Sequence, residues 1–179
     1  STGGVGLTDG DYFGAVEYTG TVGSFTEGQQ GYQMSDVDGI STLILDPVDA
    51  EIVQFDLYVQ QKLTNGVNAN WETSDSISVW YEGANSVVSI LNTTGTDIDT
   101  AHTGLLGTWT TFTVNLTGSG VGSLKFSLES NAATEAIYVD NVTFSGGTTL
   151  LADADDDDDG WTDVDEVDCG TDPLDPASV

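Results

Sequence analysis

The acidic C-terminal region contains the residues whose types and spacing point most directly to chemistry. Residues 155–166 follow the pattern D-x-D-x-D-G-x5-E, which is typical of a calcium-binding loop. Such a loop takes oxygen ligands from alternating positions and two oxygens from its final glutamate, and it suits Ca2+ better than the smaller Mg2+. The expected ligands are Asp155, Asp157, Asp159, the backbone carbonyl of Trp161, Asp163 (directly or through water) and Glu166.

The charge of this region couples ion binding to folding. Adjacent carboxylates about 6 Å apart repel each other by roughly 0.7 kcal/mol per pair even in water. A divalent cation reverses the sign of that interaction, so we expect binding and folding to occur together. The alternative is a solvated acidic tail, because most runs of like charge are solvated. The glycine at the sixth position of the pattern and the glutamate at the twelfth favour the calcium loop.

The segments on either side of the loop differ from those of an intracellular EF-hand. Residues 148–151 are too few for the preceding amphipathic helix, and Gly170 ends any following helix within a turn or two. The sequence G-T-D-P-L-D-P then occupies residues 170–176. Together with the loop, it resembles a bacterial thrombospondin type 3 repeat over about residues 153–178. The resemblance implies a calcium-filled repeat of an extracellular protein.

The overall composition excludes several classes of partner. Thirty acidic residues stand against two basic ones, which gives a formal net charge of -28. Nucleic acid and anionic lipid both need a basic surface, so neither is an expected partner. A hydrophobic content of 38% is too high for a disordered acidic polymer. No apolar run is long enough for a membrane span. We therefore expect a folded protein kept soluble by carboxylates, in an extracellular location, either secreted or on a cell surface.

The first part of the chain has the pattern of β-strands. Residues 51–60 and 123–129 alternate apolar and polar side chains with a period of two. Similar segments occupy residues 12–18, 40–45, 76–82, 86–91, 108–116 and 136–144, with turn-rich sequences such as Asn65-Gly66 between them. This pattern predicts an all-β fold, an antiparallel two-sheet jelly-roll sandwich. The composition changes near Gly147, so we expect a sandwich domain at residues 1–147 and the calcium-binding repeat at residues 148–179.

Several of these segments resemble the MAM-like and carbohydrate-binding-module-like jelly rolls of secreted proteins. The segments that carry the resemblance are residues 10–14, 51–58, 75–79, 109–114 and 137–142. In several of these families the aspartate of the last strand helps to bind a structural calcium ion, and Asp140 is the residue that matches. The second carboxylate would be Asp9, Asp11, Asp38 or Asp75, of which we name Asp75. The alternative for Asp140 is an exposed acid on an edge strand.

Sugar binding would need aromatic faces together with a few polar groups that hold hydroxyls. Trp71 follows a polar loop and is the first candidate, although it also suits a plug at one end of the sandwich. Trp80 and Tyr58 fall on the polar side of their strands, so they are candidates on an outer face. We therefore name Trp71, Trp80 and Tyr58 as ligand-binding residues.

Enzymatic activity is not expected. The single histidine, His102, lies in a loop without a nucleophile motif. Glu51 and Asp56 have opposite parity on one strand, so they would not face a common sugar bond. The sequence predicts a non-catalytic, Ca2+-binding extracellular module that is glycan-binding or adhesive, with a polysaccharide as its partner. The alternative is a structural subunit of a calcium-dependent surface layer or filament, in which copies of the chain contact one another.

Overall fold

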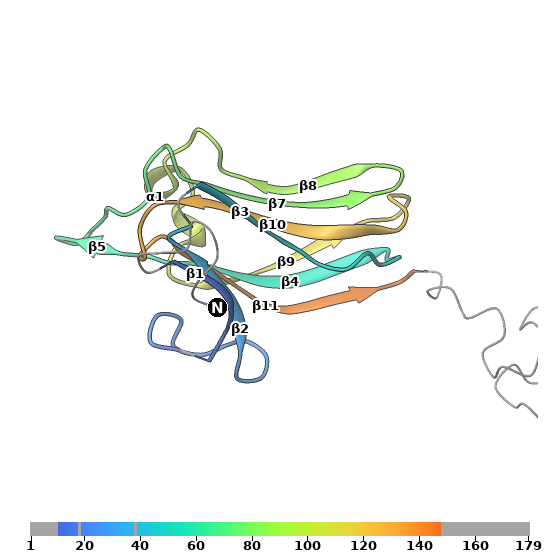
Figure 1. Ribbon diagram of the computed structural model, residues 1–179, viewed down its shortest axis with the longest axis horizontal. Helices are drawn as coiled ribbons and strands as arrows, with labels where there is room; N and C mark the ends of the chain where they lie inside the picture. Colours follow the sequence, from blue (N-terminus) through green and yellow to red (C-terminus); the bar gives the residue numbers. More distant parts are fainter. Residues whose placement is uncertain (1–10, 18, 38, 148–179) are drawn as a thin grey trace, which may run out of the picture. The chain divides into compact units, whose positions relative to one another are not determined.

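The computed structural model describes residues 11–17, 19–37 and 39–147. Figure 1 shows two packed layers of strands. One is a five-stranded sheet of order β1-β2-β11-β4-β9, and the other is a four-stranded sheet of order β3-β10-β7-β8. In chain order the elements are β1 (Tyr12–Val16), β2 (Gly31–Ser35), β3 (Gly39–Ile44), β4 (Ile52–Val59), β5 (Leu63–Thr64), β6 (Val67–Asn68), β7 (Ser76–Gly83), β8 (Val87–Asn92), α1 (Ile98–Ala101), a 3-10 helix (Thr103–Leu105), β9 (Trp109–Asn115), β10 (Gly122–Ser130) and β11 (Ala136–Ser145).

Neighbouring strands of both sheets pair antiparallel. The predicted all-β, antiparallel jelly-roll sandwich is therefore confirmed. The chain forms two units by its contacts, Ser1–Gly146 and Gly147–Val179, and the sandwich lies in the first. Residues 148–179 lie outside the described residues, so the predicted division at residues 147/148 and the calcium-binding repeat remain predictions.

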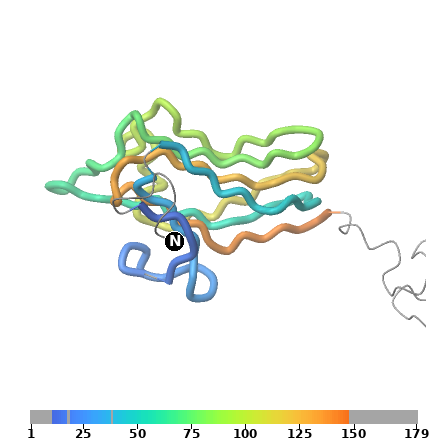
Figure 2. The backbone as a smooth tube through the Cα atoms, viewed as in Figure 1, coloured from blue at the N-terminus to red at the C-terminus, as the bar shows by residue number. Residues whose placement is uncertain are grey.

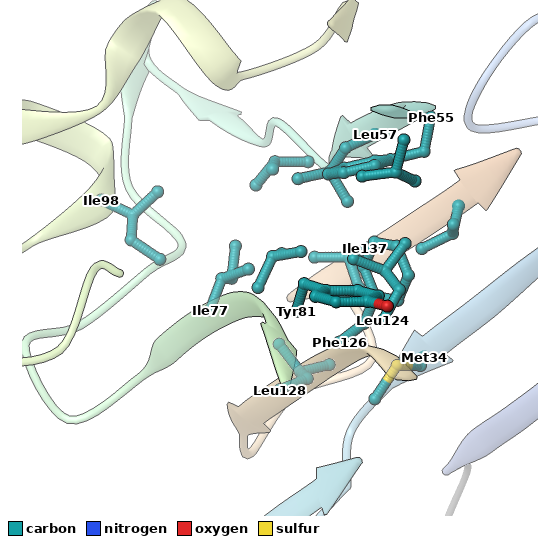
Figure 3. Packing of buried hydrophobic residues seen from close by; sticks show 14 of the residues in the cluster. Met34, Phe55, Leu57, Ile77, Tyr81, Ile98, Leu124, Phe126, Leu128 and Ile137 are labelled. Carbon is teal, nitrogen blue, oxygen red and sulfur yellow. The ribbon is translucent and has the colours of Figure 1, made fainter. Parts of the chain in front are cut away.

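The core lies between the two sheets and follows from the period-2 pattern. Along β10, buried residues alternate with partly exposed ones over the whole strand. Phe126 of β10 meets Phe55 of β4 edge to face, with 5.0 Å between the ring centroids. Figure 3 shows these rings among aliphatic side chains from both sheets. The residues that alternate inward in the sequence therefore build one apolar layer.

Strand β2, the β5–β6 hairpin, helix α1 and the 3-10 helix are absent from the sequence prediction. Strand β2 has only five residues, and its period-2 apolar pair is too short to stand out from the surrounding loop. The β5–β6 hairpin turns at Asn65 and Gly66, whose φ angles are 53° and 81°. Positive φ at both central residues is the geometry that an Asn-Gly turn supports. The turn signal was therefore visible in the sequence, whereas the two-residue strands beside it were not.

The two sheets differ on their outer faces. Residues 19–30, in the blue segment between β1 and β2 in Figure 2, pack against part of the outer face of the five-stranded sheet. Trp109 of β9 donates its Nε1–H to the Ser24 carbonyl at 2.8 Å, and the Tyr58 hydroxyl donates to the Thr21 carbonyl at 3.1 Å. The loop thus covers a second apolar cluster that includes Tyr58 and Tyr138.

Within residues 11–17, 19–37 and 39–147, no helix combines the length and the apolar character that a bilayer crossing requires.

Candidate functional site

A groove lies on the outer face of the four-stranded sheet, and the register of the strands explains its composition. In β7, the odd-numbered residues Ile77, Val79 and Tyr81 point into the core, so the even-numbered side chains point outward. Register then aligns the outward side chains of β3, β10, β7 and β8 in rows across the sheet. The groove has a volume of about 450 Å3 and is lined by Ile40, Ser76, Ser78, Val79, Trp80, Val87, Ser89, Leu91, Asn92, Thr94, Ser127 and Glu129.

The first row contains an aromatic platform. Trp80 is half-buried and pairs with Ser89 on one side and Lys125 on the other. The Lys125 ammonium lies 5.9 Å from the Trp80 ring centroid, within the range of a cation–π contact. Lys125 also forms an ion pair with Glu82, and this hydrogen bond and charge hold the pKa of Glu82 below its usual range. The ammonium is therefore held over one face of the indole ring.

The second row consists of small hydroxyl side chains. Ser78 pairs with Ser127, and Ser127 pairs with Thr42. The Thr42 hydroxyl donates to the Ser127 hydroxyl oxygen at 3.2 Å. Small side chains in this row, between the larger ones of the neighbouring rows, leave the hollow of the groove. The row presents oxygen atoms that can donate or accept hydrogen bonds.

The third row ends the groove with a carboxylate. Ser76 pairs with Glu129, and the Ser76 hydroxyl donates to Glu129 Oε2 at 3.3 Å. Ile40 pairs with Glu129 on the other side and is 70% exposed. The groove therefore offers an aromatic ring at one row, hydroxyls in the middle and a carboxylate at the far row. This combination suits a ligand with apolar C–H faces and many hydroxyl groups.

The three predicted ligand-binding aromatics have different positions. Trp80 lies on an outer face, as its parity predicted, and lines the groove, while its role in ligand binding stays a prediction. Trp71 is only 3% exposed and belongs to the main core, and its Nε1–H donates to the Gln60 carbonyl at 2.9 Å. Its ring has no free face for a sugar, so the ligand-binding assignment of Trp71 is corrected to the alternative plug of the sandwich.

Tyr58 also needs a correction. Its position in β4 places it on an outer face, as predicted, but residues 19–30 cover this part of the face. The ring packs edge to face with Trp109 and Tyr138, at centroid distances of 5.5 and 6.0 Å. Sequence parity gives the side of the sheet, but it does not reveal a loop that folds back over that side.

The two predicted carboxylates of a structural calcium site do not lie together. Asp140 Oδ2 accepts the backbone N–H groups of Thr26 and Glu27 at 2.7 and 3.0 Å, and Oδ1 accepts the N–H of Asn141 at 2.8 Å. Asp75 instead groups with Glu72 and Glu135. Asp140 therefore fixes the covering loop, and it is neither a groove residue nor a partner of Asp75.

The Glu72, Asp75 and Glu135 group forms a second concentration of charge. One carboxylate oxygen from each residue lies within 4.8 Å of the others. Burial raises the pKa of Asp75 to about 6, and nearby carboxylates including Glu72 and Glu129 add to the shift. Burial likewise raises the pKa of Glu135 to about 7. Two carboxylates this close repel by about 3 kcal/mol at the dielectric typical of a protein surface.

The residues of the predicted calcium loop, Asp155, Asp157, Asp159, Trp161, Asp163 and Glu166, lie outside the described residues. The hydroxyls and Glu129 of the groove were not predicted. Their outward parity is visible in the sequence, but their grouping depends on which strands pair, and period-2 alternation carries no information on pairing.

Comparison with known proteins finds no matching family model and no matching curated protein. The chain is similar to several solved structures. One is a family 61 carbohydrate-binding module in complex with β-1,4-galactotriose, at 12% identity and a TM-score of 0.42, covering 72% of this chain and 77% of that one. A second is the K2 cleaved adhesin domain of Lys-gingipain, at 18% identity and a TM-score of 0.47, covering 78% and 84%.

A third is the family 11 carbohydrate-binding module of a cellulosomal cellulase of Clostridium thermocellum, at 12% identity and a TM-score of 0.39, covering 80% of this chain and 87% of that one. At these identities and scores, the ligand chemistry of this chain has to come from its own groove residues.

Proposed function

We propose that this chain is a non-catalytic, glycan-binding module of an extracellular protein, and that the glycan binds in the groove on the four-stranded sheet. The observation that carries the proposal is the row register that sets Trp80 beside the hydroxyls of Ser78 and Ser127 on an open face. A sugar ring presents C–H groups on its faces and hydroxyls around its edge. The indole ring offers a surface for the face, and the serines offer partners for the edge.

The charge of the groove favours a neutral glycan. Glu129 closes one end, and the ammonium of Lys125 is already paired with Glu82. A uronate or sulfate would meet the Glu129 carboxylate and a chain of net charge -28 without a free cation in the groove. A neutral polysaccharide meets no such repulsion.

The single carboxylate also favours binding over hydrolysis. Among the described residues that line the groove, Glu129 is the only acid. Glycoside hydrolysis needs a pair of carboxylates placed on either side of the scissile bond. One carboxylate hydrogen-bonded to Ser76 instead suits the holding of a sugar hydroxyl.

Calcium binding and the extracellular location belong to the same proposal. Their support is the D-x-D-x-D-G-x5-E pattern of residues 155–166 and the composition of the chain. We propose that Ca2+ organises this C-terminal segment as a thrombospondin type 3-like repeat, which follows the glycan-binding module in a secreted or cell-surface protein.

The groove is tested by matched tryptophan substitutions. On an array of neutral plant and microbial polysaccharides, the unchanged chain should bind, and Trp80→Ala should lose at least about tenfold in affinity through loss of the stacking surface. Trp109→Ala is the control, because Trp109 lies on the other sheet. An affinity unchanged by Trp80→Ala, or the absence of binding to every glycan of the array, would overturn the proposal.

A second candidate function is a structural subunit of a calcium-dependent layer or filament. The exposed apolar side chains of edge strand β3, Ile40 at 70% and Ile44 at 57%, favour it, because an exposed apolar edge can pair with another copy. Light scattering with and without Ca2+ separates the two functions. A binding module stays monomeric in Ca2+, whereas a structural subunit assembles.

A further inference from the structure

We infer that Glu72, Asp75 and Glu135, together with the hydroxyl of Ser130, form a binding site for a divalent cation at one end of the sandwich. The site differs from the predicted loop at residues 155–166 and from Asp140. It is also distinct from the proposed glycan groove, because none of its four residues lines that groove.

The three carboxylates converge from separate parts of the chain. Glu72 and Asp75 precede β7, and Glu135 precedes β11. One oxygen from each lies within 4.8 Å of the others. Asp75 and Glu135 are 1% and 2% exposed, whereas Glu72 is exposed. The group therefore consists of two buried carboxylates and one solvent-exposed carboxylate, and an ion can enter from the exposed side.

Backbone N–H groups hold one oxygen of each buried carboxylate. Asp75 Oδ2 accepts the N–H of Glu72 at 2.6 Å. Glu135 Oε2 accepts the N–H groups of Asn131 and Ala132, each at 2.9 Å. These bonds fix the orientation of both carboxylates before any ion binds.

The Ser130 hydroxyl provides an independent indication of a ligand. It is buried and has no hydrogen-bond partner, and the residue is only 2% exposed. Ser130 is two residues after the buried Leu128, so its side chain points to the same inner face of the sheet. Asp75 is two residues before the buried Ile77 and points to that inner face as well. The pair Glu129–Ser76 is in register, so the next position places Ser130 opposite Asp75 on the same inner face.

Ser130 also directly precedes Asn131, whose N–H holds Glu135. Register places Ser130 next to Asp75 on the inner face, and the neighbouring Asn131 N–H binds Glu135, so the unpartnered hydroxyl is adjacent to both segments that carry the buried carboxylates. A buried hydroxyl without a partner costs free energy. A cation bound at this position would be coordinated by the Ser130 hydroxyl oxygen.

No basic side chain of the described part of the chain neutralises this group. The one ion pair between described residues joins Lys125 to Glu82. Lys62 is exposed and forms no such pair. Close, buried carboxylates are retained in proteins when they are paired or bind a metal. In a chain with two basic residues, a cation from solution is the available counter-charge.

The surrounding network keeps the site in place. Asp99 Oδ2 accepts the N–H groups of Asn70 and Trp71 at 2.5 and 2.8 Å, immediately before Glu72. The Asn70 side chain in turn bonds both the carbonyl and the hydroxyl of Thr134, immediately before Glu135. The two segments that supply the carboxylates are therefore tied to each other.

The donor set selects the class of ion. Three carboxylates and a hydroxyl are hard oxygen ligands, and the described group has no histidine or cysteine. Such ligands suit Ca2+, which takes six to eight oxygens in a flexible geometry and completes its shell with water. Ca2+ is therefore the probe for this site.

The test uses the full chain with the C-terminal loop silenced. Asp155→Asn, Asp157→Asn and Asp159→Asn together give a reference protein in which Ca2+ uptake by residues 155–166 is removed. Calorimetric titration with CaCl2 at pH 7.5 should still show one saturable site. Glu72→Gln in this background should weaken that site at least about tenfold. Because Glu72 is exposed, the variant keeps the fold, which circular dichroism verifies.

Glu129→Gln is the matched control. It removes one negative charge beside the group without removing a ligand, so it should change the affinity by less than the Glu72→Gln substitution. Binding in the reference protein that falls with Glu72→Gln and persists with Glu129→Gln supports the site. A reference protein that binds no Ca2+, or one whose binding both substitutions change equally, overturns it.

Discussion

At the level of single residues, burial decides which aromatic side chains can serve a ligand. Trp71 and Trp80 are nine positions apart, yet one ring fills the core and the other faces the groove. Their sequence contexts favoured the opposite ranking, because Trp71 follows a polar loop and Trp80 lies within a strand. The polar loop before Trp71 lies at one end of the sandwich, and the Trp71 ring there packs into the end of the core. Function at this scale therefore follows solvent exposure.

The two tryptophans should respond differently to truncation. Trp71→Ala leaves a cavity and an unpaired Gln60 carbonyl, so it should lower the free energy of unfolding by about 3–5 kcal/mol. Trp80→Ala removes a half-buried ring and should cost much less. Urea denaturation in the presence of Ca2+ measures both. Equal losses from the two substitutions would contradict the assignment of Trp71 to the core.

At the level of elements, the loop between β1 and β2 determines which sheet face is open. Residues 19–30 cover an apolar cluster on the outer face of the five-stranded sheet, whereas the outer face of the four-stranded sheet carries the groove. Asp140 is the main polar anchor of this loop, through Thr26 and Glu27. Asp56 lies beside it: burial raises its pKa, but hydrogen bonds from Thr111, Thr26 and Asn141 outweigh that effect and lower it.

Removing the anchor should release the loop. Asp140→Ala deletes the acceptor of three hydrogen bonds from Thr26 and Glu27, and hydrogen bonds to a charged group are worth about 1.5–3 kcal/mol each. We expect faster amide hydrogen exchange at Thr26 and Glu27 and greater exposure of Tyr58 to solvent. Exchange measured by mass spectrometry tests this. Unchanged protection of residues 20–30 would show that the apolar cluster alone holds the loop.

The strands themselves were predictable where alternation is long. Strands β4 and β10 each sustain it over eight or nine residues, and both were predicted close to their observed bounds. Strand β2 was missed, because five residues offer too few alternations. The rows of the groove and the Glu72, Asp75 and Glu135 group could not be predicted, since each joins residues that only strand pairing and turns bring together. Local periodicity determines which face of a sheet each side chain occupies. Which side chains meet in a site depends instead on the register between strands that are distant in the sequence.

At the level of the whole molecule, the excess of acid determines how stability depends on conditions. The chain has thirty acidic residues and two basic ones, so most carboxylates repel one another. The burial of Asp75 and Glu135 adds two groups with raised pKa values, about 6 and about 7. A raised pKa in the folded state means that folding takes up protons between the unfolded and folded pKa values.

Stability in chelator should therefore fall as the pH rises. The contribution of Asp75 and Glu135 is fully present below their unfolded pKa near 4 and is lost as the pH passes about 6 and then about 7. The comparison protein is Glu135→Gln. Subtracting its pH-dependent stability from that of the unchanged chain removes the contribution of every other titrating group that the two proteins share. With EDTA, the unfolding midpoint of the unchanged chain should fall more steeply from about pH 4.5 to 7 than that of the variant. Parallel curves would show that Glu135 ionises normally in the fold.

The most direct measurement of the central claim is a map of the ligand surface by nuclear magnetic resonance. A neutral oligosaccharide from the best polysaccharide on the array would be titrated into the isotope-labelled full chain. The account predicts that the Trp80 indole N–H and the amides of Ser78 and Ser127 shift in a saturable way, while Trp71 and Tyr58 stay unchanged. Saturable shifts confined to the five-stranded sheet, with Trp80 unmoved, would contradict it.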